Sequence, residues 1–60
     1  MDGASLHIAT ARLALGRALA AAGQRAKGIA ELEAAAVILR RDDPEGDILP
    51  RAEAALRAIK

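Results

Sequence analysis

The sequence predicts an all-α protein, made of an antiparallel helical hairpin followed by a third helix. Alanine supplies 17 of the 60 residues, and there is no Phe, Trp or Tyr. Apolar side chains recur at helical spacing through two long runs on either side of Gly23. Asp43-Pro44 then ends the second run, because proline does not continue a helix. We expect a single helical domain over residues 1–60, with helices at about 5–22, 25–41 and 47–59.

The first predicted helix begins near Ser5, whose hydroxyl can cap the free amides of the first turn. Its apolar positions form two adjacent stripes, one through Leu6, Ala9 and Leu13 and the other through Ile8, Leu15, Leu19 and Ala22. Gly16 lies in the middle of this helix, where glycine costs about 1 kcal/mol relative to alanine. We therefore expect another helix to pass close to Gly16.

Gly23 is placed to end the first helix in a left-handed conformation. Only Gln24 and Arg25 follow before the next run, so the second helix must turn back along the first. The apolar face of that second helix comprises Ile29, Leu32, Ala35, Ala36 and Leu39, with Gly28 as its small contact. We expect Gly16 and Gly28 to form the mutual contact of the two helices; the alternative is that one of them seats a partner helix.

The third helix has two possible starts. Asp43 could cap it with Pro44 at the first position, or Asp47 could cap it with Pro50 still in the first turn. We prefer Asp47, because Pro50 deeper in a helix would lose a hydrogen bond and clash with the preceding turn. The apolar face of this helix comprises Ile48, Leu49, Ala52, Ala55, Leu56 and Ile59.

Composition and charge restrict the class of protein. The net charge is only +1, which is too balanced for a polybasic tail that binds nucleic acid or a membrane. Because the chain has no aromatic residues, it also has no stacking platform for the bases of single-stranded nucleic acid. No apolar run is long enough to cross a membrane, and the first residues have no signal-peptide pattern. The absence of cysteine excludes disulfides. Together these features predict a cytoplasmic protein that does not bind membranes, and they make nucleic acid a less favoured partner.

Few residues are candidates for chemistry. His7 is the only histidine, and general acid–base catalysis needs a positioned partner that the sequence does not indicate. The carboxylates between positions 42 and 47 lack the ligand spacing of a calcium loop, so they are interpreted as a solvated loop rich in caps. No phosphate-binding glycine loop or metal-ligand spacing occurs. We therefore predict no enzyme, no catalytic residue, no metal and no cofactor.

One stretch resembles a single tetratricopeptide (TPR) motif. The matching positions are Leu15-Gly16, Leu19, Gly23, Gly28-Ile29, Leu32, Ala35 and Asp43-Pro44. The resemblance makes residues 10–44 one repeat and residues 46–60 a capping or following helix, while the alanine- and arginine-rich style is similar to repeats in large bacterial regulators. Arg12 stands where the family usually has tryptophan, and Leu19 and Leu32 replace its aromatic residues.

The resemblance also implies a binding surface. In TPR arrays the first helix lines a concave peptide groove, which by position would bring Thr10, Leu13, Arg17 and Ala21 to that groove. The lysine and asparagine with which some members hold a peptide carboxylate are replaced here by Leu13 and Arg17. Val37 and Ile38 add an apolar patch that two helices would leave exposed. The candidate partner-binding residues are thus Thr10, Leu13, Arg17, Val37 and Ile38.

The large aliphatic residues are only eight Leu, five Ile and one Val, which makes a small core for a chain of this length. We therefore expect a protein–protein interaction module that forms a homo-oligomer or docks on a larger protein. Two alternatives stay open: a small helical DNA- or RNA-binding regulator that uses its arginines, and an inactive fragment of a longer repeat array.

Overall fold

The computed structural model describes residues 3–59 and contains three α-helices: α1 (Gly3–Ala21), α2 (Arg25–Asp42) and α3 (Ile48–Ile59). No β-strand occurs in that range, so the prediction of an all-helical chain with three helices is confirmed. The prediction of Ser5 as an N-cap is wrong, because α1 begins at Gly3 and Ser5 lies inside its first turn. The start preferred for the third helix is close to the observed one, since α3 follows directly after Asp47.

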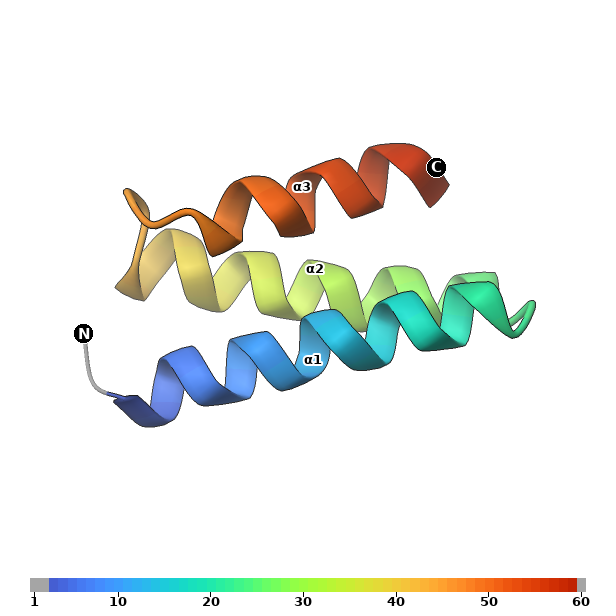
Figure 1. Cartoon of the computed structure of the whole chain (residues 1–60), viewed down its shortest axis with the longest axis horizontal. Helices are drawn as coiled ribbons and strands as arrows, with labels where there is room; N and C mark the ends of the chain where they lie inside the picture. The colour runs from blue at the N-terminus through green and yellow to red at the C-terminus, as the bar shows by residue number, and fades with distance from the viewer. Residues whose placement is uncertain (1–2, 60) are drawn as a thin grey trace.

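The three helices lie side by side, with α2 in the middle (Figure 1). The chain runs along α1, turns, returns along α2 and runs forward again along α3. Helix α2 packs against both neighbours, whereas α1 and α3 contact each other only slightly. The Cα atoms span 33 × 19 × 13 Å, so the molecule is elongated along its helices. Helix α2 is therefore the element that holds α1 and α3 together.

Helix α2 supplies the centre of the core. Leu32 and Leu39 are the largest fully buried side chains, and they lie two turns apart on the same face. The other buried apolar residues are Ala35 and Ala36 of α2, Ala9 and Leu13 of α1, and Leu49, Ala52 and Leu56 of α3. Because alanine fills so much of this core, the helix axes can lie close together.

The turn after α1 satisfies the free carbonyl groups at the end of that helix. Gly23 has φ +87°, the left-handed conformation that glycine adopts without a Cβ penalty. The amide of Gly23 donates to the carbonyl of Ala20 at 3.1 Å, and the amide of Gln24 donates to the carbonyl of Leu19 at 2.9 Å. These two bonds form a Schellman motif. The predicted role of Gly23 is therefore confirmed.

The closest approach of α1 to α2 is at Gly16 and Gly28. A Cβ atom on Gly28 would lie 2.7 Å from the carbonyl oxygen of Gly16 and 3.0 Å from the amide nitrogen of Ala20. A Cβ atom on Gly16 would lie 2.8 Å from Cγ of Leu32. The two glycines are thus the mutual contact of their helices, and neither is open to a partner helix.

The other end of the α1–α2 pair is joined by polar groups. Asp42, the last residue of α2, interacts with its neighbour Arg41, with 3.3 Å between Arg41 Nε and Asp42 Oδ1. Hydrogen bonds from Arg41 and from the Ser5 hydroxyl hold the pKa of Asp42 below its usual value. Ser5 therefore connects the first turn of α1 to the end of α2, instead of capping its own helix.

Candidate partner-binding groove between α1 and α3

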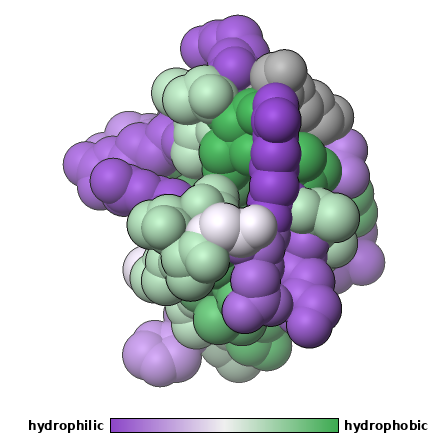
Figure 2. Space-filling view, turned by 90° about the vertical axis from the view of Figure 1, so that its right-hand side faces the viewer, coloured by the Kyte–Doolittle hydropathy of each residue, from purple (hydrophilic) through white to green (hydrophobic). Residues whose placement is uncertain are grey.

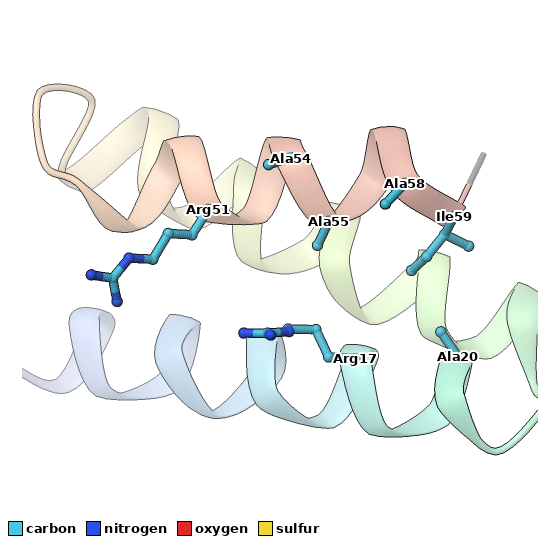
Figure 3. Close-up of a pocket in the computed structure, with 7 residues that line it drawn as sticks. All are labelled: Arg17, Ala20, Arg51, Ala54, Ala55, Ala58 and Ile59. Atoms are coloured by element: carbon cyan, nitrogen blue, oxygen red, sulfur yellow. The ribbon is translucent and has the colours of Figure 1, made fainter.

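An open groove of about 490 Å³ is lined by residues of α1 and α3. Figure 3 shows two arginine side chains, Arg17 from α1 and Arg51 from α3, extending into the space between these helices. The remaining lining is apolar and consists of Ala20 of α1 and Ala54, Ala55, Ala58 and Ile59 of α3. The groove thus combines an apolar surface with two cationic side chains.

Local sequence explains why the groove stays open. The side chains that line it are mostly alanine, which is too short to fill the space between α1 and α3. Larger apolar residues of α3, such as Leu49 and Leu56, point instead into the core that they share with α2. Arg40 of α2 and Glu53 of α3 approach to 3.6 Å, and a side-chain nitrogen of Arg25 donates to the carbonyl of Ile59. Helix α3 is therefore attached to α2 along its length.

The groove is electropositive. No acidic residue lines it, and neither Arg17 nor Arg51 forms an ion pair with any residue between positions 3 and 59. Two unneutralised guanidinium groups on facing helices raise the local potential and favour a bound anion. Figure 2, a view onto one end of the helices, shows hydrophilic side chains projecting around and across apolar surface.

The five predicted partner-binding residues do not form one surface. Arg17 lines the groove between α1 and α3. The hydroxyl of Thr10 is exposed and donates to the carbonyl of Leu6 at 2.8 Å, and Leu13 is only 7% exposed and belongs to the core. Val37 of α2 is 58% exposed, whereas its neighbour Ile38 is partly buried against the core. Ala21, which the resemblance also brings to the groove, is exposed but does not line it.

Sequence reasoning missed Arg51 and the alanines of α3. These residues belong to the groove only because α3 lies opposite α1, and nothing local to α3 indicates which helix it faces. One signal was present: Arg51, Ala54 and Ala58 recur at helical spacing next to Ala55, which belongs to the predicted apolar face. That spacing indicates a shared surface, but not its neighbour in the fold.

Two other kinds of site are not found in residues 3–59. No three His, Cys, Asp or Glu side chains in this range are grouped to hold a metal ion. Likewise, no helix described between these positions has the length and apolar character needed to span a membrane. Comparisons with protein-family models, with curated proteins and with solved structures found no match for the chain.

Proposed function

We propose that this chain is a TPR-like interaction unit, a helical hairpin with a third helix, that binds an acidic segment of another protein in the groove between α1 and α3. The observation that carries the proposal is the pair Arg17 and Arg51, two cations that face an apolar groove without a carboxylate partner between positions 3 and 59. The TPR resemblance, which assigns the concave face to the first helix, supports the same surface.

The lining specifies the chemistry of the bound segment. Its carboxylates would accept charge-assisted hydrogen bonds from the guanidinium groups, for which bidentate geometry is available to arginine. Its apolar side chains would contact the alanine-lined wall of α3 and Ile59. An amphipathic acidic segment meets both requirements, with the apolar contact supplying affinity and the charges supplying orientation.

A protein partner is favoured over nucleic acid. Only two arginines line the groove, and the whole chain has a net charge of +1. Nucleic-acid binding depends on neutralising several phosphates, and single strands also need aromatic stacking that this sequence cannot provide. DNA and RNA are therefore tested as the competing ligand.

The experiment measures the binding of short fluorescent peptides in which leucine or alanine alternates with glutamate. The comparison peptides have the same sequences with lysine in place of glutamate. We expect the acidic set alone to bind, with an affinity that falls as salt is raised. The double change Arg17→Gln and Arg51→Gln removes two exposed charge contacts, so the affinity should fall by about three- to thirtyfold.

Arg57→Gln is the matched control, because Arg57 is an exposed arginine of α3 that does not line the groove. It should leave peptide affinity within about twofold, a difference well below 1 kcal/mol. Equal binding of the acidic and basic peptides, or no effect of the double change, would refute the proposal. Binding of duplex or single-stranded oligonucleotides in place of peptides, with a steep salt dependence, would support the nucleic-acid alternative instead.

A further inference from the structure

One face of α1 points directly away from the core and exposes two large apolar side chains. Ile8 is 49% exposed and Leu15 is 48% exposed, and they lie two turns apart on the same side of the helix. Exposed alanines precede, separate and follow them, so that the face reads Ala4, Ile8, Ala11, Leu15, Ala18 and Ala22. We refer to these six residues as the α1 seam.

The spacing of the seam is that of a helix–helix contact. Its members alternate steps of four and three residues, which is the heptad pattern of a coiled-coil interface. The core residues Ala9, Leu13 and Gly16 lie on the opposite side of α1, facing α2 and α3. Helix α1 therefore has two apolar faces, and the fold of one chain covers only one of them.

The order of large and small residues makes the seam complementary to itself. A two-fold axis across α1 at the level of Leu13 would place a second copy of the helix antiparallel to the first. Ile8 would then lie opposite Ala18 of the other copy, and Leu15 opposite its Ala11. Each large side chain meets a small one throughout, which is the condition for close packing at an isologous interface.

We propose that two copies of this chain associate through the α1 seam as an antiparallel homodimer. The charges beside the seam do not oppose this pairing. Arg12 of α1 and Glu31 of α2 form an ion pair of 2.9 Å beside the middle of the seam, where Glu31 also borders a shallow depression with Ile8 and Leu15. The two-fold axis places the corresponding ion pair of the second copy on the same flank of the contact, and because each arginine is already paired with a carboxylate, no unpaired charge meets its own copy there.

The size of the seam sets the affinity class. A helix of 19 residues is roughly 28 Å long and presents a contact strip about 10 Å wide. That strip is smaller than the roughly 800 Å² per partner of a standard stable interface. The dimer is therefore a dissociable one, with a dissociation constant in the micromolar range.

Sedimentation velocity tests the dimer on the full chain, from about 10 to 500 μM, a range that resolves a micromolar dissociation constant. We expect the mean mass to rise from that of one 6.2 kDa chain toward twice that value. Leu15→Glu should abolish the rise, because it places a charge opposite Ala11 in an apolar contact. Circular dichroism checks that the variant keeps its helices. A monomer throughout the range would overturn the proposal.

A swap of residue sizes tests the antiparallel register. Ala11→Leu alone places a leucine opposite Leu15 of the other copy, which overpacks the contact. Leu15→Ala alone places an alanine opposite Ala11 of the other copy, which leaves the contact unfilled. Each change should weaken the dimer about tenfold or more. The double variant with both changes again places one leucine opposite one alanine at each contact. It should regain most of the lost affinity, and failure to do so would overturn the antiparallel register.

Val37→Glu is the matched control, since Val37 is the other large apolar side chain of comparable exposure and lies on α2. It should leave the sedimentation profile unchanged. If Val37→Glu abolishes association while Leu15→Glu does not, the contact between copies lies on α2, and the α1 seam is not the interface.

Discussion

At the scale of single residues, Gly16 and Gly28 determine how closely α1 approaches α2. The two glycines face each other across the helix crossing, where any Cβ atom would lie 2.7 to 2.9 Å from the carbonyl oxygen of the facing glycine. Contacts that short are absent from packed proteins, so the helices would have to move apart. The buried side chain of Leu32 lies at the same crossing and would move with them.

Gly28→Ala should therefore destabilise the fold by about 1–3 kcal/mol, as an overpacked core does. In an isolated helix the same change stabilises the helix by about 1 kcal/mol. The sign of the stability change therefore shows whether Gly28 lies at a tight helix crossing or on an open helix surface. Urea denaturation measures it. Gly3→Ala is the control, because a Cβ atom on Gly3 meets nothing within 4 Å. A stability gain in both variants would show that the crossing is wider than described.

Leu32 is the second position where one side chain affects the whole fold. It is fully buried in α2, between the crossing glycines and the centre of the core. Leu32→Ala should lower the free energy of unfolding by about 2–5 kcal/mol through lost contacts and an unfilled cavity. Val37→Ala on the exposed face of α2 should change it by less than about 0.5 kcal/mol. A loss below about 0.5 kcal/mol for Leu32→Ala would mean that the core face of α2 is rotated.

At the scale of elements, the helices are joined by different chemistry at the two ends of the α1–α2 pair. The Gly23 turn joins α1 to α2 through backbone hydrogen bonds, and the opposite end depends on the carboxylate of Asp42 with Arg41 and Ser5. Of these two sets of contacts, the second includes a carboxylate and the first consists of backbone hydrogen bonds. The two ends should consequently respond differently to acid.

The lowered pKa of Asp42 predicts a pH-dependent contribution to stability. A carboxyl group whose folded pKa lies below its unfolded pKa stabilises the fold at neutral pH. That contribution is lost as the pH falls below about 4 and through the folded pKa. Asp42→Asn should thus lower the melting temperature at pH 7, and the difference from the natural chain should shrink in acid.

Thermal denaturation followed by circular dichroism at pH 7 and near pH 3 measures this difference, around the usual carboxyl range. Asp47→Asn is the control, because it removes a carboxylate from the loop before α3 and not from the contact between Asp42 and Ser5. If the melting temperature of Asp42→Asn differs from that of the natural chain by the same amount at both pH values, the charge of the Asp42 carboxylate is not the cause of the difference.

At the scale of the whole molecule, α2 alone among the three helices of residues 3–59 packs closely against two neighbours. It contributes the two largest fully buried side chains and separates α1 from α3 (Figure 1). Stability should therefore be uneven along the chain, highest in α2 and lower in α3, which packs mainly on one neighbour. Amide hydrogen exchange should show the slowest exchange in α2. Slower exchange in α3 than in α2 would contradict this order.

The proposed groove and the α1 seam occupy different sides of α1, which predicts that their effects are independent. Arg17→Gln with Arg51→Gln should weaken peptide binding without changing sedimentation, and Leu15→Glu should do the reverse. The natural chain should also melt at a higher temperature when more concentrated, because dimerisation stabilises the folded state by mass action. A melting temperature independent of concentration would contradict the dimer.

Much of the secondary structure could be predicted from local sequence, because helices and their ends depend on neighbouring residues. Gly23 ended α1, the apolar periodicity gave the core face of α2, and Pro50 limited where α3 could begin. The groove was only partly predictable. Arg17 was identified through the TPR resemblance, whereas Arg51 joins it through a contact between helices far apart in sequence.

Local sequence thus accounts for three helices, a tight left-handed turn and two glycines suited to a close crossing. Which apolar residues are covered depends on how the helices pack together. Leu13 is buried while Leu15, only two residues later, is half exposed, because α2 and α3 both lie on the Leu13 side of α1. A helix presents residues two apart on nearly opposite faces, and only its packing against the other helices selects which face becomes core.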